Sequence, residues 1–259
     1  MSAYSKQQLV QEGQYTFPYH FIPHDVNGAW TVSTHLWWGY EYLAILDSIT
    51  NLVIDHQPKR VLDFGCGDGR LISELCKKGV PEIYGIDFSK RALLLSQVMV
   101  DYNDRVKLFG DLEEIRDQQF DIAIAMEVIE HIPPEQTKSI ITAIHSILGE
   151  EGTFIISVPT KNIPVNRKHY RHFTVHELEQ EVAGLFLIDR VYFVHKIGTV
   201  CNILRRAVAN KFLIPLWLPW LKLTATLYKR FVMEAQEHNG AHLIAVLRKA
   251  EKGSQCSTA

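Results

Sequence analysis

Cysteine is scarce in this chain of 259 residues, and the four that occur, Cys66, Cys76, Cys201 and Cys256, form no C-x-x-C pair. This spacing argues against a cysteine-only zinc site and suits a reducing compartment such as the cytosol. The chain also lacks a strong charge of either sign, because its net charge is −2. No global basic field attracts a phosphate backbone, so nucleic acid is disfavoured as a partner.

Long apolar runs are missing as well. The first eight residues are polar and contain no signal-peptide core, which predicts a cytoplasmic protein. The most apolar stretch, 212–221, is shorter than the about 20 residues of a spanning helix. Pro215 and Pro219 also interrupt it, so we expect no transmembrane segment there.

Glycine, in contrast, is concentrated in one motif, VLDFGCGDGR at 61–70. An apolar strand leads into Gly65, Gly67 and Gly69, and helical spacing follows. This order is typical of a doubly wound α/β sheet that holds a nucleotide or nucleoside against bare backbone. The spacing G-x-G-x-G differs from the dinucleotide pattern G-x-G-x-x-G, and Asp63 would repel a pyrophosphate. A cationic ligand is therefore favoured.

These residues resemble the first motif of the class I S-adenosylmethionine (AdoMet) methyltransferases, which is two apolar residues, an acid and three alternate glycines. The resemblance implies AdoMet as cofactor and a Rossmann-like, seven-stranded, mostly parallel sheet with helices on both faces. It also implies a set of cofactor-binding residues: Asp63, Gly65, Cys66, Gly67, Gly69, Asp87, Phe88, Asp111, Leu112 and Met126.

Two acids after later strands support that cofactor. Asp87 ends a strand roughly twenty residues beyond the glycines, where doubly wound folds place the acid that binds ribose hydroxyls. Phe88 would then stack on adenine, and the resemblance assigns Asp111 and Leu112 to the adenine as well. The alternatives are structural, because Asp87 could cap the next helix and Gly110-Asp111 is also common turn chemistry.

The remaining elements follow from hydrophobic periodicity. Strands are expected at 61–64, 82–87, 105–109, 120–125, 152–159, 186–194 and 242–247. Helices are expected at 34–54, 71–76, 89–102, 135–148 and 174–185. We therefore predict a helical and aromatic cap over 1–57, an AdoMet-binding domain over 58–250 with an apolar, basic helical insert at 197–238, and a flexible tail over 251–259.

Acceptor chemistry is expected after the strand at 120–125. Glu127, Glu130 and His131 stand at i, i+3 and i+4, which would place all three on one face of a helical turn. With His172 from a later loop they could ligate a divalent ion such as Mg²⁺, Mn²⁺ or Zn²⁺ and activate a hydroxyl. Alternatively, no metal is bound, the acids fix the loop, and His131 or His172 acts as general base.

The Glu-x-x-Glu-His pattern resembles that of the ubiquinone-pathway O-methyltransferases and of the small-RNA 2′-O-methyltransferases. Ile132 stands where the RNA family has a second histidine. We therefore expect O-methylation of a small-molecule, glycan or lipid-like acceptor, with catalytic residues Glu127, Glu130, His131 and His172. The alternatives are RNA 2′-O-methylation and a non-catalytic AdoMet-binding protein associated with a membrane.

One segment carries charge of a single sign. From Arg190 to Met233 there is no Asp or Glu, while cations are spread through the segment and Trp217 and Trp220 stand at its centre. Tryptophan with scattered cations is typical of a segment at a membrane interface. We predict peripheral membrane contact through 205–230, against three alternatives: helices packed on the sheet edge, a dimer interface, or a lid over an apolar substrate.

Overall fold

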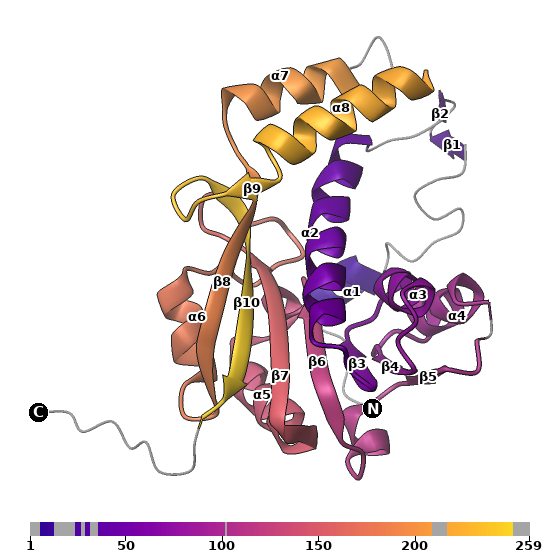
Figure 1. Ribbon diagram of the computed structural model, residues 1–259, viewed down its shortest axis with the longest axis vertical. Coiled ribbons are helices and arrows are strands. Elements are labelled where there is room, and N and C mark those ends of the chain that lie inside the picture. Colours follow the sequence, from indigo (N-terminus) through magenta and orange to yellow (C-terminus); the bar gives the residue numbers. More distant parts are fainter. Residues whose placement is uncertain are drawn as a thin grey trace, which may run out of the picture.

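The computed structural model describes residues 6–12, 24–26, 29–31, 36–101, 103–208 and 217–250. The tail predicted over 251–259, the apolar centre of the insert at 212–216, and residues 1–5, 13–23, 27–28 and 32–35 of the predicted cap lie outside the described residues. Figure 1 shows one α/β body with a pair of helices above one end of its sheet.

The sheet has eight strands in the order β5-β4-β3-β6-β7-β10-β8-β9. All seven predicted strands are present, and the eighth, β9, is too short for sequence periodicity to reveal. β10 runs antiparallel to both of its neighbours, while the five strands from β5 to β7 in that order pair in parallel. The bounds are β3 Arg60–Phe64, β4 Glu82–Ile86, β5 Val106–Phe109, β6 Phe120–Met126, β7 Leu148–Pro159, β8 Phe186–Lys196, β9 Glu234–Ala235 and β10 Gly240–Lys249.

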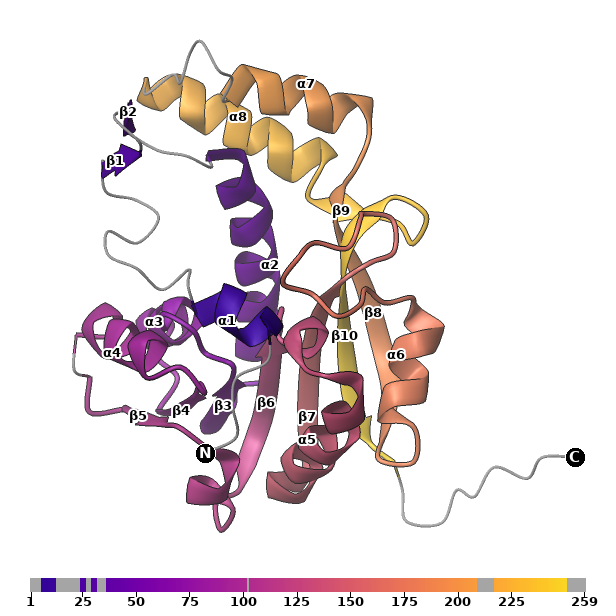
Figure 2. The same ribbon diagram turned by 180° about the vertical axis from the view of Figure 1, so that it is seen from behind.

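Helices cover both faces of this sheet, as the sequence predicts, and Figures 1 and 2 show the two layers. Two 3₁₀ turns, η1 and η2, lie at the ends of β5 and β6. Outside the sheet, β1 (His24–Val26) and β2 (Ala29–Thr31) form a separate pair. The helical bounds are α1 Lys6–Glu12, α2 Leu36–Asp55, α3 Arg70–Lys77, α4 Lys90–Met99, η1 Leu112–Ile115, η2 Ile129–His131, α5 Pro134–Ile147, α6 Val175–Val182, α7 Thr199–Val208 and α8 Leu218–Phe231.

Strand alternation divides the core in two. Along β6, Ala123 and Ala125 face a cluster that includes α5 and α6, whereas Ile122 and Ile124 face a cluster that includes α2 and α3. Successive side chains of a strand point to opposite faces, so a strand buried on both sides has to be apolar throughout. This explains why β6 shows a continuous apolar run except for Asp121, which is exposed at its start.

The chain reverses its direction of travel across the sheet between β3 and β6. It runs from β3 outward to β4 and β5, then returns to place β6 on the other side of β3. Ligands of open α/β sheets bind at the carboxyl ends of strands at such a switch point. The loops after β3, β4 and β6, which carry the glycine motif, Asp87 and Glu127, therefore meet at one edge.

Candidate active site

The glycine motif forms a tight turn between β3 and α3. The backbone N–H groups of Gly65 and Cys66 both donate to the carbonyl oxygen of Ile86, at 2.7 and 2.9 Å. Gly65, Gly67 and Gly69 have φ values of 76°, 54° and 79°, which non-glycine residues rarely adopt. A Cβ on Gly65 would lie 2.4 Å from Cγ2 of Val128, so the loop after β6 passes directly over the turn.

Asp87, at the end of β4, holds this turn in place. Its Oδ2 accepts a hydrogen bond from the Gly67 N–H at 2.9 Å, and its Oδ1 accepts one from the Ser89 N–H at 2.8 Å. The cap of α4 is Ser89, whose hydroxyl accepts from the Ala92 N–H. Asp87 therefore links the ends of β3 and β4, and a carboxylate oxygen can accept more than one hydrogen bond.

Asp63 is the buried acid of the motif. Its Oδ2 has no hydrogen-bond partner among the residues that the structure describes. Burial, and after it the neighbouring charges of Asp87 and Asp68, raise the pKa of Asp63 from 3.8 to about 8. A buried carboxylate without a partner is unfavourable unless a ligand completes it. The ammonium group of AdoMet is such a ligand, so a buried acid with an unsatisfied oxygen beside the glycine turn fits the cofactor.

The other predicted cofactor residues surround the same edge. Phe88 is 41% exposed and follows Asp87 directly. Asp111 caps η1, where its side chain accepts from the Glu113 N–H, so it also has the structural role that turn chemistry predicts. Cys66 is buried in the core beneath the turn, and Met126 packs at the end of β6.

Glu127 does not share a helical face with Glu130 and His131, which corrects the sequence expectation. Its φ is 56°, and the helical turn η2 begins only at Ile129. The left-handed backbone turns the Glu127 side chain back over the sheet. There the Ser157 hydroxyl donates to Glu127 Oε1 at 2.9 Å, and His242 Nδ1 lies 2.8 Å from Glu127 Oε2.

Glu130 is fully buried on η2. Neither of its carboxylate oxygens has a hydrogen-bond partner within the described part of the chain. Burial, followed by repulsion from Glu127, raises the pKa of Glu130 well above its usual value. A buried carboxyl group without hydrogen bonds is stabilised when it binds a proton, a hydrogen-bonding ligand or a cation.

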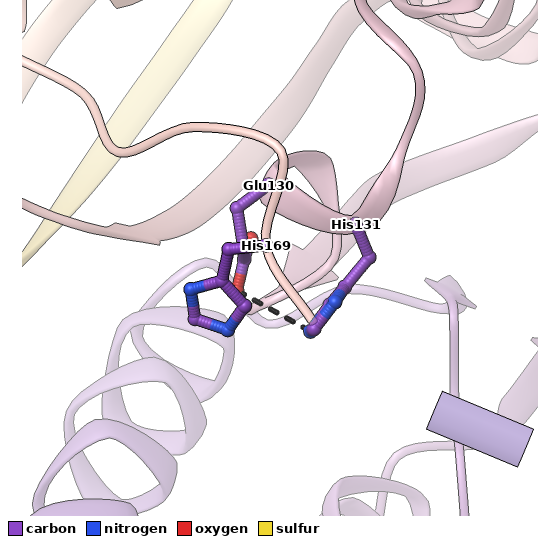
Figure 3. Close-up of side chains that lie close together, drawn as sticks. All are labelled: Glu130, His131 and His169. Atoms are coloured by element: carbon purple, nitrogen blue, oxygen red, sulfur yellow. Dashed lines mark ion pairs between the residues drawn. The ribbon is translucent and has the colours of Figure 1, made fainter. Parts of the chain in front are cut away.

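Two imidazoles face this carboxyl group, and Figure 3 shows the three side chains converging. His131 Nε2 lies 3.8 Å from Glu130 Oε1. The candidate ligand atoms of Glu130, His131 and His169 all lie within 4.8 Å of one another. Burial lowers the pKa of His131 to about 4 and that of His169 to about 2, so both rings are neutral at pH 7.

Hydrogen bonds define the tautomers of these rings. His131 Nδ1 lies 2.9 Å from the Lys168 carbonyl oxygen, so Nδ1–H is the donor and Nε2 keeps the lone pair. His172 Nδ1 contacts the Ile163 carbonyl at 3.0 Å, and His172 Nε2 contacts His169 Nδ1 at 2.8 Å. His169 therefore donates to His172, and its lone pair is on Nε2. The structure places His172 behind His169, and His169 is the residue that the sequence analysis missed.

A second group of buried polar side chains, absent from the sequence predictions, joins the site to the helices above it. His242 Nε2 lies 2.6 Å from Glu41 Oε1, and Glu41 Oε2 lies 4.0 Å from His195 Nε2. His195 Nδ1 in turn contacts the Tyr228 hydroxyl of α8 at 2.9 Å. Glu41 comes from α2, far from the site in sequence, so no local pattern could reveal this contact.

Fold, glycine turn and buried acids together define a class I AdoMet-dependent methyltransferase. A family model described as a methyltransferase domain matches residues 37–193, and the chain belongs to that family. Two similar curated proteins are ubiquinone biosynthesis O-methyltransferases. The one from Neisseria meningitidis serogroup C is 29% identical over 127 residues, 47% of this chain and 51% of the relative. The one from Hahella chejuensis is 34% identical over 114 residues, which are 38% of this chain and 47% of the relative. The chain thus spans about half the length of the curated relatives it matches.

Solved structures show the same fold. The 1,6-didemethyltoxoflavin-N1-methyltransferase of Burkholderia thailandensis superposes with a TM-score of 0.57 at 18% identity, over 97% of this chain and 93% of that one. The magnesium protoporphyrin IX methyltransferase of Synechocystis superposes with a TM-score of 0.57 at 15% identity, over 96% of this chain and 99% of that one. These two structures contain S-adenosylhomocysteine and AdoMet, respectively.

Proposed function

We propose that this methyltransferase methylates a hydroxyl oxygen of a small-molecule acceptor held against Glu130, His131 and His169. One observation supports this proposal above all: a fully buried carboxyl group, with no hydrogen-bond partner among the described residues, faces two neutral imidazoles. When bound, AdoMet supplies the methyl group on a positively charged sulfur. The chain has to position an oxygen behind that carbon and remove the proton from it.

His131 is the residue that takes this proton. Its Nδ1–H is engaged by the Lys168 carbonyl, which leaves the Nε2 lone pair on the side of Glu130. A neutral imidazole with a fixed tautomer is a competent general base. The negative charge of Glu127, and of Glu130 when it is ionised, stabilises the imidazolium that forms.

The same three side chains also fit a divalent cation. One carboxylate and two imidazoles are a typical donor set for Zn²⁺ or Mn²⁺, and Glu130 has both oxygens available. Glu130, His131 and His169 would hold the ion, while His172 would orient His169 from behind. The bound ion would lower the pKa of an acceptor hydroxyl. Glu127, in contrast, is directed to Ser157 and His242.

Ubiquinone biosynthesis O-methyltransferases are among the similar curated proteins, so a catechol-like hydroxyl is the acceptor class to test first. The purified protein should transfer labelled methyl from AdoMet to 3,4-dihydroxybenzoate used as a soluble catechol. We expect His131→Asn and Glu130→Gln to lower kcat about 100-fold or more. His176→Asn, an exposed histidine on α6, is the matched control and should retain full activity.

A second set of acceptors tests the alternatives. Transfer to the 3′ end of a short single-stranded RNA, with none to the catechol, would contradict the proposal and favour RNA 2′-O-methylation. Equal activity of His131→Asn and the control would show that the imidazole does not act on the acceptor. Binding of S-adenosylhomocysteine, measured in parallel by calorimetry, separates loss of chemistry from loss of the cofactor.

A further inference from the structure

Large apolar side chains are exposed on the hairpin formed by α7 and α8. Trp217 is 69% exposed, Leu218 61% and Ile203 59%, with Val200 at 51%, Phe231 at 50% and Leu223 at 49%. Single exposed apolar residues are ordinary, but six in one helical hairpin are a mark of an interaction surface.

Cations accompany these apolar side chains. Arg205 and Arg206 are exposed on α7, and Lys222, Lys229 and Arg230 are exposed on α8. Within the whole segment 190–233 the sequence offers no acid to offset them. Lys229 has an acidic neighbour on α2, because its Nζ lies 3.4 Å from Asp47 Oδ2. The surface therefore combines apolar side chains with an excess of positive charge.

The opposite face of the hairpin is already occupied. Cys201 and Leu204 of α7 and Tyr228 of α8 are buried in one cluster with Ala44 of α2. Polar contacts reinforce this packing, since Tyr228 bonds His195 and the Thr224 hydroxyl lies 3.0 Å from Tyr40. The hairpin is thus packed on α2 by its inner face, and its outer face is the part left for a partner.

We propose that the outer face of the α7–α8 hairpin is a docking surface for an anionic lipid bilayer. Interfacial helices insert apolar side chains among the headgroups while their cations pair with anionic lipid. Among the residues that the structure describes, no helix is long and apolar enough to cross a membrane. The contact we propose is therefore peripheral, and charge complementarity makes anionic lipid the occupant.

The position of the hairpin gives this docking a consequence for the site. α7 and α8 lie above the end of the sheet at which β3, β4 and β6 terminate (Figures 1 and 2). Through Tyr228, His195, Glu41 and His242 the hairpin is connected to Glu127. A bilayer at the outer face would lie on the acceptor side, so a lipid-like acceptor could enter from it. This last point rests on the proposed function, whereas the docking itself does not.

Vesicle co-sedimentation tests the docking without any acceptor or cofactor. The full chain is mixed with vesicles of phosphatidylcholine alone or with about a third phosphatidylglycerol. We expect binding to the anionic vesicles, weak binding to the neutral ones, and loss of binding at high salt because surface charge is screened. Arg205→Gln with Lys222→Gln should weaken binding about 30-fold. Ile203→Ser with Leu218→Ser should weaken it as well.

Matched controls are available at the far edge of the molecule. Lys59 and Lys78 are exposed cations next to the amino ends of β3 and β4, and their double Gln variant should bind vesicles like the wild type. All variants should still bind S-adenosylhomocysteine, which shows that they are folded. The proposal would be overturned if the Lys59/Lys78 variant lost as much vesicle binding as the Arg205/Lys222 variant, or if the wild type did not bind anionic vesicles. Dissociation of a dimer by the hairpin variants, without vesicle binding, would identify a second copy as the occupant and overturn it too.

Discussion

His242 Nδ1 lies 2.8 Å from Glu127 Oε2, and this ion pair joins β10 to the loop that follows β6. The other ring nitrogen of His242 lies 2.6 Å from Glu41. Burial alone would lower the pKa of His242, but the charges of Glu127 and Glu41 raise this pKa to about 10. A charged imidazolium between two carboxylates therefore holds Glu127 in its left-handed conformation.

Removing this imidazolium should destabilise the protein. His242→Gln leaves two largely buried carboxylates without their shared cation, which we expect to lower the free energy of unfolding by about 3 kcal/mol. Urea denaturation measures the loss. The double variant Glu41→Gln with His242→Gln should lose less than the sum of the single variants, because the two side chains act on each other. Strict additivity would show that the pair is not coupled.

The same pair predicts a dependence of stability on pH. Because the folded pKa of His242 is raised above its usual 6.5, its stabilising contribution is complete below pH 6.5 and is lost as the pH rises through about 10. The difference in unfolding free energy between wild type and His242→Gln should therefore shrink between pH 7 and 10. A difference that stays constant across this range would contradict a charged His242.

Asp63 should lower the stability of the cofactor-free protein and strengthen the binding of the cofactor. The pKa of Asp63 is raised from 3.8 to about 8. Between these two pH values the folded chain binds more protons than the unfolded chain, so stability falls as the pH rises through this range. Asp63→Asn should raise the melting temperature without ligand at pH 8 and weaken S-adenosylhomocysteine binding about tenfold or more. Asp104→Asn, at an exposed site, should change neither value. If Asp63→Asn binds S-adenosylhomocysteine as well as the wild type does, Asp63 does not contact the ammonium group.

Gly65 is constrained by contact as well as by backbone conformation. In Gly65→Ala the new methyl group would meet Val128, so we expect about 2 kcal/mol more destabilisation than for Gly79→Ala. Gly79 also has a positive φ but faces open space, and so it isolates the backbone cost. Adding Val128→Ala to Gly65→Ala should recover part of the loss. Thermal denaturation provides the comparison, and equal costs for the two alanine variants would exclude the steric contact.

Metal binding can be measured without turnover. Calorimetric titration of chelator-treated protein with Zn²⁺ or Mn²⁺ should show one site, which Glu130→Gln and His169→Asn abolish. His172→Asn should weaken it about tenfold, as expected for a residue that only orients a ligand. His176→Asn should leave it unchanged. The absence of any binding heat in the wild type, together with full activity in chelator, would leave His131 as a general base without a metal.

Local pattern was enough to predict much of the fold and the conformation of the glycine turn. The seven long strands carry continuous or alternating apolar residues, and the glycine motif encodes a turn with positive φ that Gly65, Gly67 and Gly69 adopt. The boundaries were less well predicted: β7 begins at Leu148 rather than at Gly152, because pairing between Phe120 and Leu148 extends it. β9 was missed because two residues carry no periodicity.

The acceptor side depended on the tertiary structure. Spacing alone placed Glu127, Glu130 and His131 on one helical face, but the left-handed backbone at Glu127 sends its side chain to His242 on another strand. His169 stands three residues before His172 in the same loop, and only the path of that loop brings it to Glu130 and His131.

The sequence by itself determined the class of the sheet, the glycine turn and the acids that line the cofactor edge, because each depends on residues close together along the chain. Tertiary structure decided which side chains share the acceptor side, since Glu41, Glu127 and His242 come from three separate elements. It also decided which face of the α7–α8 hairpin stays exposed, because α2 covers the other face. Contacts between distant segments follow from how whole elements pack, and no local spacing records them.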